Sequence, residues 1–343
     1  EIENHLPAKV KRDLARKDIN FYIIDGWKIA SEIGLGGRIN MIMQAAFFKL
    51  SEVMPLDDAI KYLKEGIEKT YKKKGQKIVD MNCAAVDKGI TAIHKVEIPE
   101  EWADVQNPKE KYEELPEFIE EILIPMNHQE GDDLPVSAFS GREDGTFPSG
   151  TSAYEKRGVA IMLPEWKEEN CIQCNQCSFV CPHAAIRPIV MNEEEAKAAP
   201  EGTAMIKHKR TDYQYALIVS ALDCTGCGSC ANVCPTKSLT MKPIASQLHV
   251  QKSFDALVDT PAKPEVLTPN TIGVQFRKPY LEFSGACAGC GETPYAKLVT
   301  QLYGDKMYIA NATGCSSIWG GSAPSTPYTV DKNGHGPAWS NSL

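Results

Sequence analysis

Eight of the twelve cysteines form two copies of one spacing that is typical of iron–sulfur proteins. Each copy reads C-x2-C-x2-C-x3-C-P; the first copy begins at Cys171 and the second at Cys224. In two-cluster proteins with this run, the first three cysteines of a copy bind one cluster and the fourth binds the other cluster. The sequence therefore predicts one [4Fe–4S] cluster on Cys171, Cys174, Cys177 and Cys234, and a second on Cys224, Cys227, Cys230 and Cys181.

Two other uses of cysteine fit this pattern less well. Structural zinc sites are usually closed by two pairs of ligands, often with histidine, and do not require a duplicated four-cysteine run. Disulfides need an oxidising compartment, and the sequence shows no secretory segment. Electron transfer through iron–sulfur clusters is therefore the expected chemistry.

A third set of cysteines lies in glycine-rich segments near residue 300: Cys287, Cys290 and Cys315. Glycine lets the backbone approach a cofactor closely, but three thiolates are one short of a closed [4Fe–4S] site. A lone C-x2-C also occurs in thioredoxin-like proteins, in half of a zinc site and as free thiols. The spacing alone leaves a third cluster open. Cys83, in an apolar helical stretch, is interpreted as a buried free thiol.

Composition limits the classes of function. A chain of 343 residues is long enough for two or three domains. A formal net charge of −8 argues against nucleic-acid binding, which needs a concentrated basic surface. No apolar run reaches the length of a membrane span. We expect a soluble cytoplasmic protein without a nucleic-acid partner, or a hydrogenosomal one if the source is an anaerobic eukaryote.

Hydrophobic periodicity predicts alternating helices and strands in residues 1–100. We expect a buried strand at 20–25, a core helix at 39–50, an amphipathic helix at 56–74 and a further helix at 77–92. The glycines of residues 34–37, placed between strand and helix, indicate a tight turn, with a phosphate-binding loop as the alternative. An acidic helix is expected at 109–124, followed by a linker-like stretch rich in Gly, Ser, Thr and Pro.

The cluster module contains a polar insertion, residues 193–210, between its two cysteine copies. Four basic residues of this insertion are candidates for docking an acidic ferredoxin, and a solvated loop is the alternative: Lys207, His208, Lys209 and Arg210. His183 follows Cys181-Pro182, where four thiolates already complete the predicted site. We interpret His183 as a surface residue that tunes the local field and not as a ligand.

The order of these pieces resembles the middle of pyruvate:ferredoxin (flavodoxin) oxidoreductases, which are thiamine-pyrophosphate enzymes of anaerobes. The resemblance covers essentially the whole chain and is most specific after Ser284. It is carried by the doubled cysteine motif and by residues 36–41 (GGRINM), 284–295 (SGACAGCGETPY), 311–320 (NATGCSSIWG) and 334–339 (GHGPAW).

This resemblance implies an α/β multidomain fold. Its parts would be an α/β γ-like domain (residues 1–100), a linking domain (101–158), a ferredoxin domain with two [4Fe–4S] clusters (159–258) and the beginning of an α/β thiamine-binding domain (259–343). Cys287, Cys290 and Cys315 would hold a third [4Fe–4S] cluster, with its fourth ligand beyond Leu343. Glu292 and Cys315 would lie near thiamine pyrophosphate. The family's G-D-G motif for thiamine and Mg²⁺ and its pyruvate-binding domains are absent from this sequence.

The activity implied is oxidative decarboxylation of pyruvate to acetyl-CoA and CO₂. Electrons would pass through three clusters to ferredoxin or flavodoxin, and the enzyme would be a homodimer completed by the remainder of the same polypeptide. Three alternatives stay open: a related 2-oxoacid:ferredoxin or pyruvate:NADP⁺ enzyme, a two-cluster electron-carrier subunit, and a polyferredoxin subunit of a hydrogenase or formate dehydrogenase. The last of these does not explain the segment after Ser284.

Overall fold

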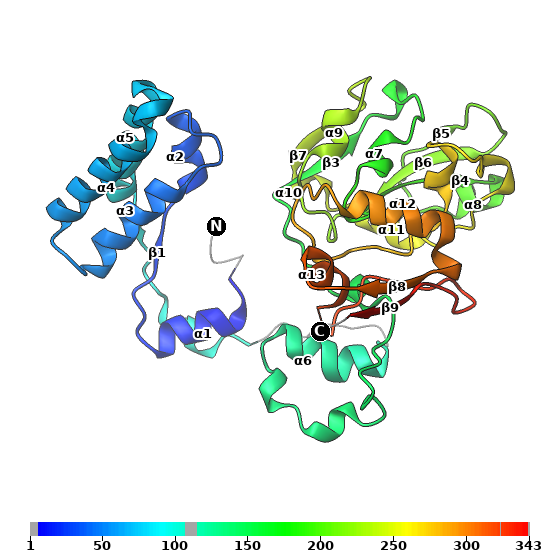
Figure 1. Cartoon of the computed structure of the whole chain (residues 1–343), viewed down its shortest axis with the longest axis horizontal. Coiled ribbons are helices and arrows are strands. Elements are labelled where there is room, and N and C mark those ends of the chain that lie inside the picture. Colours follow the sequence, from blue (N-terminus) through cyan, green and yellow to red (C-terminus); the bar gives the residue numbers. More distant parts are fainter. Residues whose placement is uncertain (1–5, 107–114, 323, 342–343) are drawn as a thin grey trace. The chain divides into compact units, whose positions relative to one another are not determined.

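The computed structural model describes residues 6–106, 115–322 and 324–341. Contacts within the chain divide it into two compact units, residues 1–112 and 113–343, which are taken in turn (Figure 1). Nowhere in the described ranges is there a helix of the length and apolarity that a membrane span requires.

The first unit is mainly helical. It contains α1 (Ala8–Arg16), α2 (Gly26–Glu32), α3 (Asn40–Ser51), α4 (Leu56–Tyr71) and α5 (Gln76–Thr91). Its sheet, within the described residues, is one antiparallel pair: β1 (Tyr22–Ile23) with β2 (His94–Lys95). The helices predicted at 39–50, 56–74 and 77–92 are confirmed, the second ending in a 3₁₀ turn at Lys72–Lys74.

The strand predicted at residues 20–25 is wrong in its extent and burial. Only Tyr22 and Ile23 pair, and both are half-buried. The strand stops because Asp25 caps a helix that the sequence analysis did not predict: its carboxylate accepts a hydrogen bond from the N–H of Lys28 at 2.9 Å, at the start of α2. The glycines of residues 34–37 therefore form a turn between two helices, and the strand that a phosphate loop would follow is not there.

Helix α3 is buried on one face only, which corrects the expectation of a core helix. Ile42 and Ala45 are at most 1% exposed, whereas Phe47 is 57% exposed. The buried face packs on α5, where Gly89 permits a close approach: a Cβ on Gly89 would lie 2.5 Å from the carbonyl oxygen of Ile42. Cys83 on α5 is a free thiol, as predicted, but is half-buried.

The second unit begins with short helical turns. The chain is π-helical at Ile119–Leu123 and continues into α6 (Ile124–Asn127), with an apolar cluster around Phe118 and Leu123. The acidic helix expected at 109–124 is thus found in part; residues 109–114 lie outside the described ranges. The linker-like stretch contains 3₁₀ turns at Gly131–Asp133, Val136–Phe139 and Thr151–Tyr154.

The cysteine-rich module is built from two similar halves. The first half runs β3 (Met162–Trp166), α7 (Gln176–Phe179), β4 (Ile186–Met191), and the second runs β6 (Gln214–Val219), α9 (Ser229–Val233), β7 (Leu239–Pro243). Strand β3 pairs antiparallel with β7, and β4 pairs antiparallel with β6, so each pair joins the two halves. The insertion between them adds α8 (Glu193–Ala198) and β5 (Ile206–Lys207), which pairs with β6.

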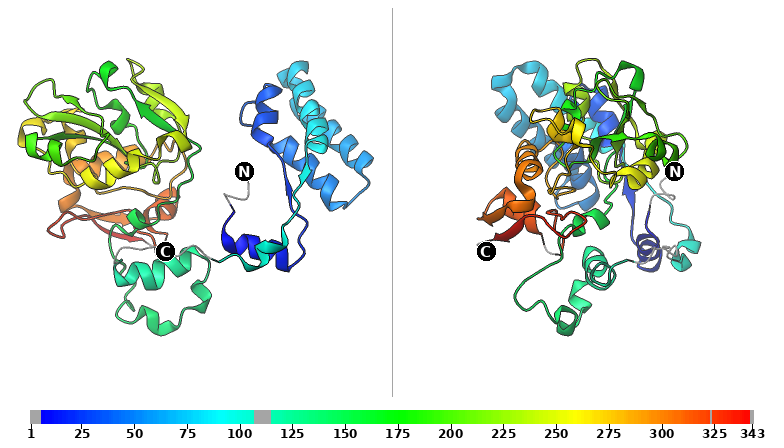
Figure 2. Two further views of the ribbon diagram at one scale, coloured as in Figure 1. Left: turned by 180° about the vertical axis from the view of Figure 1, so that it is seen from behind. Right: turned by 90° about the vertical axis from the view of Figure 1, so that its right-hand side faces the viewer.

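After the module, α10 (Ile244–Gln247) and α11 (Val250–Leu257) lead to α12 (Thr293–Tyr303) and a small β–α–β unit. That unit is β8 (Tyr308–Asn311), α13 (Cys315–Gly321) and β9 (Ala338–Asn341), with β8 and β9 parallel. Figures 1 and 2 show α12 between the module and the β8–β9 pair. Parallel strands joined by a crossover helix are the elementary unit of α/β folds.

We expect Gly89→Leu to destabilise the first unit by roughly 1–3 kcal/mol, because the new side chain must displace the α3 backbone. The matched control is Gly66→Ala on exposed α4, where a Cβ meets nothing within 4 Å; it should stabilise by about 0.5–1 kcal/mol. Hydrogen exchange of α3 and α5 amides, with thermal unfolding, measures both. Equal protection in the two variants would contradict a close α3–α5 contact.

Candidate functional site

The four cysteines of the first predicted set line one cavity. Cys171, Cys174, Cys177 and Cys234 surround about 320 Å³ of space not filled by atoms, together with Trp166 and Tyr215. Cys234 comes from the second half of the module and reaches this cavity because β7, which follows it, pairs with β3. The residues present therefore suit a group held by four thiolates.

The four cysteines of the second set line a neighbouring cavity in the same way. Cys224, Cys227, Cys230 and Cys181 surround about 390 Å³ of space not filled by atoms, partly open to solvent. All twelve cysteines of the chain are free thiols. Among residues 6–106, 115–322 and 324–341, no three His, Cys, Asp or Glu side chains converge in a way that would hold a single metal ion. Ligation of clusters by these two sets stays a prediction.

The two cysteine loops share their backbone conformation. In each, the N–H two residues after the first cysteine donates to its sulfur at 3.4 Å: Gln173 to Cys171 and Gly226 to Cys224. The residues two and four positions after the first cysteine have positive φ in both loops: 57° and 56° at Gln173 and Asn175, 68° and 76° at Gly226 and Gly228. Such loops turn backbone N–H groups toward sulfur, and hydrogen bonds to the sulfurs help to set the potential of an iron–sulfur cluster.

Only the second loop uses glycine at the left-handed positions. In the first loop, side-chain hydrogen bonds offset the cost of a left-handed conformation, which is about 1–2 kcal/mol per residue. Asn175 accepts from the hydroxyl of Tyr215 at 2.9 Å and donates to the carbonyl of Ile272 at 3.0 Å. Gln173 donates to the carbonyl of Lys207 at 2.9 Å and accepts from the N–H of Lys209 at 2.9 Å.

The Cys287–Cys290 loop shares part of this geometry outside the module, with one left-handed glycine and an N–H that donates to its second cysteine. Gly289 has a φ of 73°, and the N–H of Glu292 donates to the sulfur of Cys290 at 3.4 Å. The loop lies against the second cysteine set, since a Cβ on Gly289 would be 3.7 Å from Cβ of Cys227. A group bound by the thiolates of this loop would therefore lie next to the second cysteine set.

Helix α13, which begins at Cys315, contacts Glu292 through Trp319. Cys315 is the first residue of α13, and Trp319, four residues later on the same face, donates from Nε1 to a carboxylate oxygen of Glu292 at 3.2 Å. Ala286 packs against the apolar cluster that contains Trp319. Cys287, Cys315 and Glu292 are exposed. The roles of Cys315 and Glu292 stay predictions.

The interpretation of His183 as a surface residue is wrong. Its side chain is 3% exposed, and burial lowers its pKa. Nδ1 lies 3.1 Å from the carbonyl oxygen of Ser284, which can only accept, so the Nδ1–H donates. The N–H of Phe283 in turn donates to the carbonyl of His183 at 3.0 Å. His183 thus ties the Cys181 segment to the segment that leads into Cys287, a contact that sequence spacing does not reveal.

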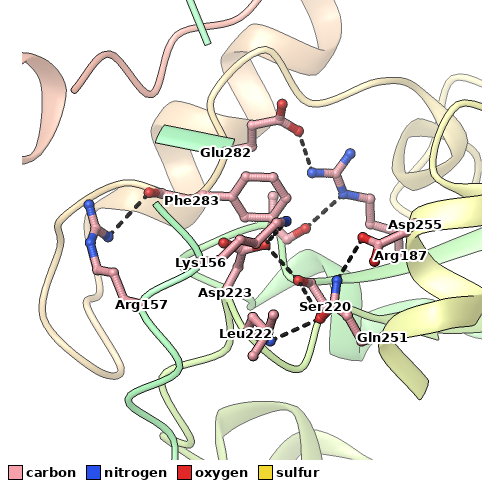
Figure 3. A network of polar contacts seen from close by, with 11 residues as sticks. Lys156, Arg157, Arg187, Ser220, Leu222, Asp223, Gln251, Asp255, Glu282 and Phe283 are labelled. Carbon is pink, nitrogen blue, oxygen red and sulfur yellow. Dashed lines mark hydrogen bonds and ion pairs between the residues drawn. The ribbon is translucent and has the colours of Figure 1, made fainter. Parts of the chain in front are cut away.

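Charged side chains reinforce the same junction (Figure 3). Arg187 forms a buried ion pair with Glu282 and lies over the ring of Phe283. Arg157 donates to the carbonyl of Ser284 at 3.2 Å. Lys156 forms an ion pair with the buried carboxylate of Asp223, next to Cys224, at 2.7 Å. The segment before Cys287 is therefore held at several points on the module.

Burial affects the thiols unequally. It raises the pKa of Cys224 and of Cys230 to about 12, so these thiols are neutral until a metal replaces the proton. At Cys290 burial opposes ionisation, but hydrogen bonds from Thr293 and Glu292 outweigh it and lower the pKa. Cys234 has a lowered pKa for the same reason, with donors around Leu239 and Thr236.

Helix α12 buries its polar residues, a feature that periodicity could not predict. Thr293, Lys297 and Thr300 are at most 2% exposed, whereas Tyr295 and Val299 are 71% and 41% exposed. The pattern is the reverse of an ordinary amphipathic helix. The ammonium of Lys297 enters the module, where it donates to the main-chain carbonyls of Ser178 and Phe179.

We expect Glu282→Gln to destabilise the protein by about 3–5 kcal/mol, because Arg187 would stay buried without its partner. The control is Glu193→Gln, which breaks an exposed pair with Lys197 and should change stability by less than about 1 kcal/mol. Thermal unfolding of the iron-loaded protein compares the two. A similar, small effect of both substitutions would show that the buried pair is unimportant.

Double substitutions test the crossed ligation. Cys234→Ser should remove about four irons, one cubane cluster. Adding Cys171→Ser should remove no more, because both residues line the first cavity, whereas adding Cys224→Ser should remove a second cluster. Iron analysis and electron paramagnetic resonance give the counts, with Cys83→Ser as the control. If adding Cys171→Ser removed a second cluster and adding Cys224→Ser removed no more iron, each cysteine copy would bind its own cluster.

Comparison with known families agrees with this geometry. Residues 2–92 match the family described as pyruvate ferredoxin/flavodoxin oxidoreductase. Residues 170–237 match the 4Fe-4S double cluster binding domain, which contains both cysteine copies. Residues 104–160 match a domain of unknown function.

Similar proteins match over the whole chain. It is 56% identical to the pyruvate-flavodoxin oxidoreductase of Enterobacter agglomerans and 54% identical to the pyruvate:ferredoxin oxidoreductase of Moorella thermoacetica; each match covers 100% of this chain and 30% of the relative. The pyruvate dehydrogenase [NADP(+)] of Cryptosporidium parvum is 45% identical, over 100% of this chain and 19% of the relative. Over its whole length the chain is similar to pyruvate-flavodoxin and pyruvate:ferredoxin oxidoreductases, and it spans about 30% of the length of these curated relatives.

Proposed function

We propose that this chain is the electron-carrying part of a thiamine-dependent enzyme that oxidatively decarboxylates pyruvate to acetyl-CoA and CO₂. The observation that supports this most is the sharing of two adjacent cavities by eight cysteines in crossed sets, with the Cys287 loop beside the second cavity. The names of the relatives supply the substrate and the acceptor class. Decarboxylation itself belongs to the whole protein, of which this sequence spans a part.

Two [4Fe–4S] clusters fit the module, and they would supply one-electron transfer. The protein's own contribution is to hold four thiolates around each cavity and to direct backbone N–H groups at Cys171 and Cys224. A backbone N–H that donates to the sulfur of Cys290 supports a third cluster on Cys287, Cys290 and Cys315. We include Mg²⁺ and thiamine pyrophosphate as cofactors of the whole enzyme, with Glu292 and Cys315 facing them.

The contacts suggest an order for the electron path. The Cys287 loop lies against Cys227 of the second set, so an electron from the active site would enter the second cluster first. The first set would then pass it to ferredoxin or flavodoxin. Lys207, Lys209 and Arg210 are exposed, and Gln173 fixes their loop beside Cys171. These three residues are our candidates for docking an acidic carrier, whereas His208 is buried and unsuited to it.

Alternative functions remain distinguishable. The match to pyruvate dehydrogenases [NADP(+)] keeps an NADP⁺-reducing enzyme as the second candidate. A two-cluster carrier would leave Cys287, Cys290 and Cys315 without a role. A homodimeric state and a cytoplasmic location are further parts of the proposal that stay predictions.

Metal and cofactor analysis of the intact protein tests the proposal. We expect about twelve irons per protomer, in three cysteine-ligated cubane clusters, together with bound thiamine. Pyruvate should then produce a radical signal in electron paramagnetic resonance. About eight irons without thiamine would reduce the protein to a two-cluster carrier and would contradict the role proposed for Cys287, Cys290 and Cys315.

A further inference from the structure

Lys297 is a buried cation at the contact between α12 and the cluster module. Its side chain is 2% exposed. The ammonium donates to the carbonyls of Ser178 and of Phe179, the latter at 3.4 Å. These carbonyls belong to the end of α7, between Cys177 and Cys181 in the sequence. A cation in this position costs free energy unless negative charge offsets it.

No carboxylate provides that charge, since Lys297 forms no ion pair within the part of the chain that the structure describes. Burial lowers the pKa of Lys297 to about 8, the sulfurs of Cys181 and Cys177 favour the ammonium, and Arg187 disfavours it, so the ammonium form prevails at pH 7. Cys177 lines the first cavity and Cys181 lines the second. Lys297 therefore binds the backbone that connects one predicted ligand of each cluster.

We propose that Lys297 raises the reduction potentials of both module clusters by holding one buried positive charge at the backbone that connects two of their ligands. The inference rests on the proposed function, because it requires clusters in the two cavities. Reduction of a cluster adds one electron from an external donor and makes or breaks no bond, so the site gains one negative charge. A nearby cation stabilises that charge strongly where the effective dielectric constant is low.

The position of Lys297 also explains why one residue serves two clusters. A cation near only one cluster would make that cluster an electron trap relative to the other. A cation next to Cys177 and Cys181 raises both potentials together, so the difference between them changes less than either value. Helix α12 begins three residues after Cys290, so the same rigid element also adjoins the third cysteine loop.

Redox titration of the intact protein, followed by electron paramagnetic resonance at pH 7, tests this role. Lys297→Gln keeps a hydrogen-bond donor but removes the charge. We expect it to lower the ratio of reduced to oxidised cluster at least tenfold at a fixed potential, equivalent to 59 mV for a one-electron couple. Lys297→Arg keeps the charge and should stay within about threefold of the native ratio.

The matched control is Thr300→Val, which changes an equally buried neutral residue of α12 and should also stay within about threefold of the native ratio. A shift as large in Thr300→Val as in Lys297→Gln would show that packing, not charge, sets the potentials. A native ratio in a fully loaded Lys297→Gln would overturn the proposal, as would loss of iron in Lys297→Gln alone, because the cation would then hold the clusters instead of tuning them. If the native protein did not contain the about eight irons of the two module clusters, the proposed function itself would be contradicted.

Discussion

Each predicted cluster needs cysteines from both halves of the module, and the pairing of the strands is what meets this requirement. The first strand of the first half pairs with the last strand of the second half, from Met162↔Pro243 to Trp166↔Leu239. The inner strands pair from Ile186↔Val219 to Met191↔Gln214. Because the register is fixed by a buried face, the fourth cysteine of each copy arrives at the opposite cavity. The Cys287 loop and α12 both contact the frame that results.

The contacts that attach the third cysteine loop to this frame are mostly polar. They include the buried Arg187–Glu282 pair, the hydrogen bond from His183 to Ser284, and the ammonium of Lys297 at the end of α7. Polar contacts add less to stability than apolar burial does, but they are directional. They suit a junction in which a small displacement would change the distance between neighbouring electron carriers, and apolar packing alone would leave that distance less well defined.

The sequence predicted the features that depend on local pattern. Cysteine spacing was enough to predict which four thiols share each cavity, because the duplicated motif has one common geometry. Helices α4 and α5 followed from apolar periodicity. Strand β1 was overestimated because its apolar run is interrupted by the cap of α2 at Asp25. The similar apolar run of α3 hid the fact that its two faces differ in burial.

Features that depend on contacts between distant segments could not be predicted. His183 follows a site that four thiolates already complete, which favours a surface interpretation, yet its side chain is buried and bonded to the carbonyl of Ser284. Lys297 lies in a helix whose apolar residues Tyr295 and Val299 are exposed, so periodicity predicts the wrong buried face. Both residues are explained only by the cysteine-bearing segments that they meet in space.

The interleaving of the two halves has a consequence for synthesis on the ribosome. On the proposed ligation, the cavity of Cys171 stays incomplete until Cys234 has left the exit tunnel, and the cavity of Cys224 needs Cys230 as well as the much earlier Cys181. The nascent first half thus carries three thiols of this cavity before the fourth has been synthesised. On this ligation, neither cluster can have all four of its ligands before the second half of the module has been translated.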